Sequence, residues 1–205
     1  MTDPARPLRS LAVSSLRSRV FLSGLALKVV LSLLFGSHFA TRWFVPFVHG
    51  FVTAGGDPWA RALASGEPLA FPYGPTMLGV LGLAFSPAAV LPIAPDGHVA
   101  LLLLRLPVLA ADIGVLLVLL AWLPSRSREL LLTWWWNPIV LYASYVHGQL
   151  DLVPTALLVG ALYWIFRGRR FAGAALLGAA IGAKLHLLVA LVFVGIALVR
   201  ERRPA

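Results

Sequence analysis

Six long apolar runs occupy most of this 205-residue chain, and short basic or polar segments separate them. The runs cover residues 20–36, 76–93, 98–123, 130–146, 152–166 and 171–199. A helix needs about 20 mostly apolar residues to cross the hydrocarbon core of a bilayer. With 60% hydrophobic and only 12% charged residues, the chain differs in composition from soluble globular domains. We therefore predict an all-α fold, a polytopic membrane helix bundle that forms a single domain over residues 1–205.

The arginines predict which side of the membrane each loop occupies. If every run crossed once, Arg126 and Arg128 would lie opposite the basic N-terminus, against the positive-inside rule. The conflict disappears if run 76–93, which two prolines interrupt, stays at the outer interface. The last run then forms two short helices that meet at the outer face near Lys184. We expect about six spans: the first at 20–36, an outer loop with interfacial helices at 37–97, and the others at 98–199.

This arrangement gathers the basic residues on the inner side. Twelve arginines lie there, in the N-terminal and C-terminal tails and the inner loops, whereas the outer loop holds only Arg42 and Arg61. The net charge of +9 thus indicates topology, and we predict no nucleic-acid partner. The basic N-terminus precedes the first run without an A-x-A-like cleavage site, which predicts an uncleaved first helix. A composition rich in Ala, Leu, Arg and Gly is typical of GC-rich bacteria, so we expect a multi-pass cell-membrane protein with a cytoplasmic N-terminus.

The outer loop carries a candidate catalytic carboxylate, Asp57. The stretch from Gly55 to Trp59 is dense in turn formers, and Asp57 before Pro58 also fits the N-cap of a helix with proline in its first turn. The two roles are compatible, because a capping carboxylate that faces a cleft can still accept a proton. A second turn-rich stretch, residues 71–75, contains Tyr73.

Three ionisable residues lie inside apolar runs. Arg105 and Asp112 are seven residues apart, which puts them on one face of a helix about two turns from each other. Ionisable groups at this depth face the bundle interior, pair with each other or line a polar pathway. Substrate binding and a structural pairing of Asp112 with a neighbouring helix both fit. Lys28, in the first run, is open to the same two interpretations.

Polar residues also gather between the later runs. A plain turn accounts for Gly148 and Asp151 but not for His147 and Gln149 together, so this loop favours substrate binding. Lys184 and His186 lie at the expected outer break, where a lysine either binds phosphate as a point charge or extends its ammonium to the interface.

Other conspicuous residues predict structure alone. Three consecutive tryptophans, residues 134–136, fit an interfacial aromatic belt, and Asn137-Pro138 should weaken or kink the helix after them. The absence of cysteine excludes disulfides and thiol catalysis. No two histidines have the i, i+4 spacing of a helical ligand pair, so we predict no metal, and no other cofactor is expected.

The order of these motifs resembles the GT-C glycosyltransferases, polytopic enzymes that use polyprenyl-phosphate sugars. The resemblance covers roughly residues 27–188 and rests on the following series: Asp57, Phe71-Pro72-Tyr73-Gly74-Pro75, Arg105-Leu106-Pro107 with Asp112, Asn137-Pro138, His147-Gly148-Gln149-Leu150-Asp151 and Lys184. It implies an inverting transfer of a sugar from a polyprenyl-phosphate donor to an acceptor at the outer membrane face.

The same resemblance implies roles for single residues. Asp57 would be the base that accepts the acceptor's hydroxyl proton. Lys184 and Arg105 would stabilise the departing phosphate, and His147, Gln149 and Asp151 would position the sugar or the acceptor.

The chain departs from the family pattern in three ways. Gly74 replaces one proline of the usual Tyr-Pro-Pro, Pro58 follows Asp57 where a second acidic or polar residue is common, and family members generally continue for several more helices. We therefore also consider a fold completed by a second membrane chain and an inactive truncated relative. A separate alternative is a non-catalytic transport or assembly subunit, in which Arg105 and Asp112 line a path or bind a partner helix.

Overall fold

The computed structural model describes residues 5–201, and every regular element in this part of the chain is helical. The α-helices are α1 (Ala5–Leu16), α2 (Arg19–Leu34), α3 (Val45–Ala54), α4 (Pro58–Ala64), α5 (Pro75–Phe85), α6 (His98–Trp122), α7 (Ser127–Leu130), α8 (Pro138–Val140), α9 (Leu152–Phe166), α10 (Arg170–Ala183) and α11 (Ala190–Glu201). Short π-helical segments are η1 (Phe39–Phe44), η4 (Leu131–Trp135) and η5 (Leu141–Val146), and short 3₁₀ segments are η2 (Ser86–Ala89), η3 (Pro124–Arg126) and η6 (Leu185–Val189). The all-α class is confirmed.

One described helix, α6, is long and apolar enough to cross a membrane by itself. Helix α2 and the segment from Phe39 to Ala54 are together also long and apolar enough for one crossing, but the chain bends by 67° between them. The other apolar helices span 10–17 residues each, so at 1.5 Å per residue they are shorter than an ordinary crossing. The six spans stay a prediction.

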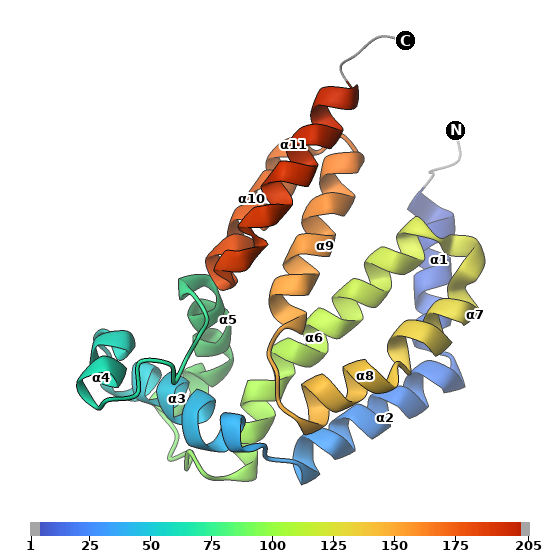
Figure 1. The fold of residues 1–205 in the computed structure, drawn as a ribbon. Helices are drawn as coiled ribbons and strands as arrows, with labels where there is room; N and C mark the ends of the chain where they lie inside the picture. The colour runs from blue at the N-terminus through green and yellow to red at the C-terminus, as the bar shows by residue number, and fades with distance from the viewer. Residues whose placement is uncertain (1–4, 202–205) are drawn as a thin grey trace.

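The predicted helix breaks are confirmed. Asn137 accepts hydrogen bonds from Ile139 N and Val140 N, at 2.9 and 3.4 Å, and so caps α8 after the tryptophans. Helix α10 ends at Ala183, and Lys184 has extended backbone angles before η6 begins. Helices α10 and α11 therefore run in opposite directions, as Figure 1 shows.

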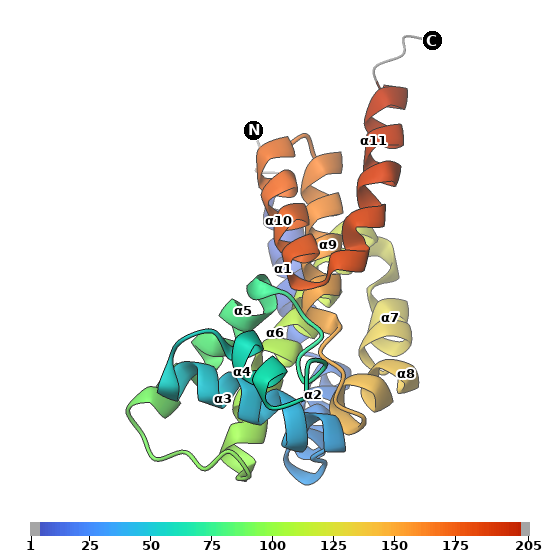
Figure 2. The same cartoon turned by 60° about the vertical axis from the view of Figure 1, so that its left-hand side comes forward.

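The two ends of the bundle differ in charge. In Figures 1 and 2 the start of α1 lies at the same end as the last turns of α6, α9 and α11 and the first turn of α10. Arginines follow α6 (Arg126, Arg128), join α9 to α10 (Arg167, Arg169, Arg170) and lie in the last turn of α11 (Arg200), whereas Arg17 and Arg19 lie at the junction of α1 and α2. Arg202 and Arg203, two of the arginines predicted for the inner side, lie outside the described residues. The connection from η5 to α9 and the α10–α11 junction lie toward the opposite end.

The outer segment predicted as a loop belongs to the main core. Helices α3 and α5 pack with α6 and with residues 145–153, and Phe44, Phe71, Met77 and Leu104 are buried there. Apolar side chains drive this packing because it removes their surface from water or from the polar interface. The segment is therefore more ordered than its turn-rich sequence indicates.

The three consecutive tryptophans connect the middle of the chain to other helices. Trp135 is fully buried, stacks on Phe21 with ring centroids 4.5 Å apart, and donates its indole N–H to Phe21 O at 3.0 Å. Trp136 donates to Val20 O at 2.9 Å, and Trp134 donates to Asp112. These indoles join η4 to α2 and α6, and the interfacial belt stays a prediction.

Candidate ligand pocket

Five of the predicted substrate-binding residues line one pocket of about 180 Å³. Tyr73 comes from the turn before α5, Lys184 from the α10–η6 junction, and His147, Gln149 and Asp151 from the connection between η5 and α9. Its other lining residues are Phe39, Trp43, Phe44, Leu69, Pro72 and Gly148. Segments more than 100 residues apart in the sequence thus form one site.

Tyr73, Asp151 and Lys184 form a hydrogen-bonded cluster in this pocket. The Tyr73 hydroxyl donates to Asp151 Oδ1 at 3.2 Å and accepts from Leu150 N at 3.3 Å. Lys184 Nζ forms an ion pair with the same carboxylate oxygen and lies 5.2 Å from the centroid of the Tyr73 ring. Burial, with Asp151 adding to it, raises the pKa of the Tyr73 hydroxyl well above its usual range. Tyr73 is therefore a fixed donor that orients Asp151.

Gly74 lets the Tyr73 turn approach α10 closely. Its N–H donates to Ala183 O at 2.9 Å, and a Cβ atom at this position would lie 2.2 Å from Gly182 O. A proline at position 74 would remove that donor. The glycine that departs from the Tyr-Pro-Pro pattern thus holds Tyr73 and Lys184 side by side.

The turn after η5 needs glycine at position 148 for two reasons. Gly148 has φ +93°, and a Cβ atom there would lie 2.3 Å from Ser37 Oγ and 3.2 Å from Arg105 Nη2. His147 packs against Phe39 and Tyr142, with ring centroids 5.4 and 6.0 Å apart. Gln149 is exposed in the pocket.

Arg105 lies behind Gly148 and not in the pocket itself. The side chain is buried, and Nη1 donates to Ser144 O at 2.5 Å, whereas Nε and Nη2 are buried without a hydrogen-bond partner. A buried cation with unpaired donors is costly unless an anion compensates it. Arg105 therefore supplies positive potential directly beneath the pocket.

Asp112 belongs to a separate buried network. Its carboxylate pairs with Lys28 Nζ at 2.6 Å, with both side chains fully buried, and it accepts from Tyr145 at 2.8 Å and Trp134 at 3.0 Å. Lys28 Nζ also lies 3.5 Å from the centroid of a Trp135 ring. The geometry thus favours the structural pairing of Asp112 with a neighbouring helix, although Asp112 and Arg105 share α6.

Asp57 and His186 do not line this pocket. Asp57 is exposed and caps α4, because Oδ1 accepts from Trp59 N at 2.9 Å and Ala60 N at 3.2 Å. His186 is exposed in η6. The cap predicted for Asp57 is confirmed, and the catalytic role stays a prediction. No group of three metal-ligating side chains occurs among the described residues.

Sequence reasoning missed the aromatic wall of the pocket. Phe39, Trp43 and Phe44 all lie on η1, and Phe39 and Trp43 contact each other edge to face at 5.5 Å. The density of aromatic residues at 39–47 was the available signal.

Comparison of the chain with protein-family models, with curated proteins and with solved structures found no match.

Proposed function

We propose that the chain is a membrane-embedded inverting glycosyltransferase that moves a sugar from a polyprenyl-phosphate donor to a hydroxyl acceptor. The observation that carries this proposal is the pocket in which Tyr73, His147, Gln149, Asp151 and Lys184 meet. Its lining combines an ammonium paired with a carboxylate, neutral polar groups and aromatic rings, which suit a sugar that bears a phosphate. The motif order described above supports the same function.

Lys184 is the group that binds the leaving phosphate. An ammonium has three donors, so Lys184 can keep its ion pair with Asp151 and still donate to a phosphate oxygen. Arg105, behind Gly148, adds a second positive charge to the field at that phosphate. Charge that grows on the departing oxygen is thereby stabilised by two cations.

In the proposed reaction, the acceptor oxygen attacks the anomeric carbon, the bond from that carbon to the phosphate oxygen breaks, and Asp57 receives the hydroxyl proton. One displacement without a covalent intermediate inverts the anomeric centre. Oδ1 of Asp57 accepts the two capping bonds, and the exposed side chain remains open to an acceptor. Because Asp57 lies outside the Lys184 pocket, the acceptor has to extend between the two.

The proposed location is the cell membrane, with several crossings and a cytoplasmic N-terminus. Two observations support it. Arginines gather after α6, between α9 and α10 and in the last turn of α11, helix ends that lie with the start of α1 in Figure 1, as the positive-inside rule requires of the cytoplasmic side. Large apolar side chains are exposed around the bundle, including Phe171 at 96%, Leu83 at 77% and Phe193 at 68%, which suits contact with lipid or another helix.

The test is release of polyprenyl phosphate from radiolabelled polyprenyl-phosphate mannose and glucose by the purified chain. Asp57→Asn keeps a side chain that caps helices well but cannot accept the proton, so turnover should disappear while the protein still folds. Lys184→Gln should also abolish turnover. Glu129→Gln is the matched control, because Glu129 is an exposed carboxylate at the arginine-rich end. Full activity in Asp57→Asn would refute the catalytic assignment.

A second candidate function, a non-catalytic membrane assembly subunit, is favoured by one surface. Between α9 and α11 lies a groove of about 410 Å³ with an almost wholly apolar lining that includes Leu158, Leu162 and Phe193. A helix of a second membrane chain would cover it. This function predicts a partner that co-purifies in stoichiometric amount, together with no sugar release by the complex.

A further inference from the structure

A second cavity, of about 280 Å³, lies beside the Lys184 pocket on the outer segment. It is formed by η1, α3, α4 and the turn after α4, and Trp43 lines both cavities. Its lining residues are Arg42, Trp43, Pro46, Phe47, Gly50, Pro58, Arg61, Ala62, Ser65, Glu67 and Ala70. This volume is just below the roughly 300–1,000 Å³ typical of pockets for drug-sized molecules, so it suits a single small ring.

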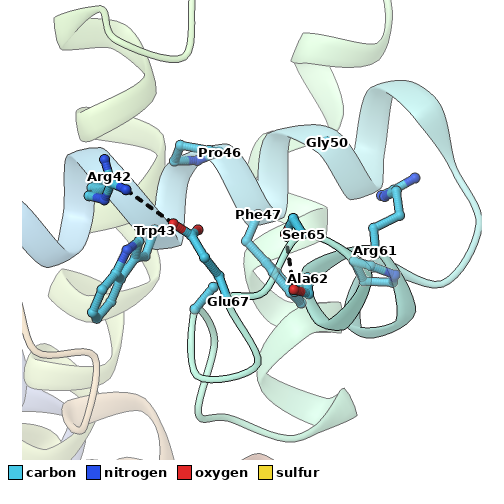
Figure 3. A pocket seen from close by; sticks show the side chains of 11 residues that line it. Arg42, Trp43, Pro46, Phe47, Gly50, Arg61, Ala62, Ser65 and Glu67 are labelled. Carbon is cyan, nitrogen blue, oxygen red and sulfur yellow. Dashed lines mark hydrogen bonds and ion pairs between the residues drawn. The ribbon is translucent and has the colours of Figure 1, made fainter.

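Polar groups are found at both ends of this cavity. Figure 3 shows Arg42, Trp43 and Glu67 together at one end and Arg61 at the other, with Phe47 and Ala62 between them. Arg42 Nη2 pairs with Glu67 Oε1 at 3.1 Å. Nε1 of Trp43 is buried without a hydrogen-bond partner, which is costly unless a bound group or a water pairs with it. Donors and acceptors thus surround an apolar middle.

Arg61 lies beside Gly50 of α3 at one wall of this cavity. Arg61 Nη1 donates to Gly55 O, and its Nη2 lies 3.9 Å from where a Cβ atom of Gly50 would be. Glycine inside a helix lowers helix stability by about 1 kcal/mol relative to alanine, so α3 is less stable with Gly50 at the wall of this cavity than it would be with alanine. Phe47 gives that wall a rigid ring, because it stacks on Phe71 with ring centroids 4.6 Å apart.

We propose that this second cavity binds a sugar ring. The lining favours a sugar, because Glu67 offers a hydrogen-bond acceptor, Arg61 and Trp43 offer donors, and the middle of the cavity is apolar. A sugar hydroxyl both donates and accepts, so it bonds equally to the Glu67 carboxylate and to the Arg61 and Trp43 N–H groups. The apolar face of the ring packs on Phe47 and Ala62.

The role of this sugar as the acceptor rests on the proposed transferase function. Pro58 lines the cavity and directly follows Asp57, so a sugar bound here has its hydroxyls near the proposed base. Trp43 lines both cavities, so the acceptor and donor sites adjoin at its side chain. Sugar binding itself needs no donor and is measured separately.

The experiment is saturation-transfer NMR on the full chain in a detergent without a sugar headgroup, with methyl α-mannoside, methyl α-glucoside and inorganic phosphate as separate probes. At least one glycoside should give signals that free sugar displaces and phosphate does not. Gly50→Leu fills the cavity and removes a helical glycine, so binding should be lost in a protein that still folds. Glu67→Gln should weaken binding about tenfold, the loss expected when a ligand loses a charged hydrogen-bonding partner.

Two controls separate this cavity from the rest of the molecule. Gly79→Leu changes an exposed helical glycine in α5 with open space around it, and it should leave binding unchanged. Glu129→Gln makes the same carboxylate-to-amide change as Glu67→Gln outside both cavities and should also bind normally. No glycoside signal, displacement by phosphate, or full binding in Gly50→Leu would overturn the proposal. Glycoside binding that Gly50→Leu abolishes, together with no sugar transfer, would uphold this site and reject the transferase.

Discussion

The buried ion pair of Lys28 and Asp112 gives the sharpest test of how the bundle is held together. The two groups are 2.6 Å apart and fully buried, and Tyr145 and Trp134 complete the hydrogen bonding of the carboxylate. Asp112→Asn keeps an oxygen that accepts hydrogen bonds but removes the charge. The variant therefore leaves the Lys28 ammonium buried without its counterion.

The expected cost of Asp112→Asn is about 3–5 kcal/mol of unfolding free energy, the usual result of removing one partner of a buried pair. Lys28→Met should cost a similar amount, because it leaves the Asp112 carboxylate buried with only two neutral donors. The double variant has no charge at the position of this pair, and methionine fills most of the space of the lysine stem. It should be at least about 2 kcal/mol more stable than the sum of the two single changes predicts.

The measurement is denaturant unfolding in mixed micelles, followed by tryptophan fluorescence, because Trp134 and Trp135 contact this pair. Arg42→Gln is the control, since the pair of Arg42 with Glu67 is about half exposed and should contribute no more than about 1 kcal/mol. Additive single effects, or a cost of Asp112→Asn no larger than that of the control, would refute the network as a buried structural element.

Three further outcomes follow from single contacts. Gly74→Ala should cost about 1–3 kcal/mol and lower the melting temperature, because its Cβ would clash with Gly182 O, and an unchanged melting temperature would contradict that close approach. Asp57→Ala should destabilise the protein by about 0.5–2 kcal/mol through loss of the α4 cap, whereas Asp57→Asn should not; equal denaturation midpoints for the two variants would rule out the cap. Burial raises the pKa of Tyr73 above its unfolded value, so its contribution to stability is complete below about pH 10 and is lost at higher pH. Tyr73→Phe should flatten the stability profile above that pH in chemical unfolding, and an unchanged slope would exclude this titration.

The sequence was sufficient for the helices and their breaks, because local residues decide them. Asn137 and Asp57 cap the helices that follow, since each has a short side chain that accepts from N–H groups two and three residues on. The break at Lys184 interrupts an apolar run with a charge. These signals act within one helical turn and need no knowledge of the rest of the fold.

Pairings across the bundle could not be predicted in the same way. Arg105 and Asp112 share a face of α6 but lie two turns apart, so they contact different neighbours. Arg105 donates to Ser144 O, and Asp112 pairs with Lys28. Lys28 and Asp112 are 84 residues apart, and no local pattern encodes that contact. Sequence position also could not show that Asp57, in the same outer segment as Tyr73, lies outside its pocket.

Part of the candidate site followed from topology. The expected topology puts the 147–151 turn and Lys184 at outer ends of spans, so it predicts that the two lie on one side and can meet. The contacts of Asp151 with both Tyr73 and Lys184 could not be predicted from topology, because they depend on Gly74 packing against the end of α10. A glycine at position 74 thus allows the Tyr73 turn to approach α10 closely, and a hydropathy pattern does not predict that approach.

The buried network also supports the pocket from below. Tyr145 binds Asp112, and its neighbour Ser144 accepts from Arg105, so η5 is held at two successive residues just before His147. Arg105 Nη2 lies against Gly148, which carries this support to the turn that lines the pocket. Ligand-binding groups act well only when supporting contacts hold them within about 0.5 Å. The ionisable residues of α6 therefore influence the pocket through the backbone of η5, which explains how residues that do not line a site can still determine its geometry.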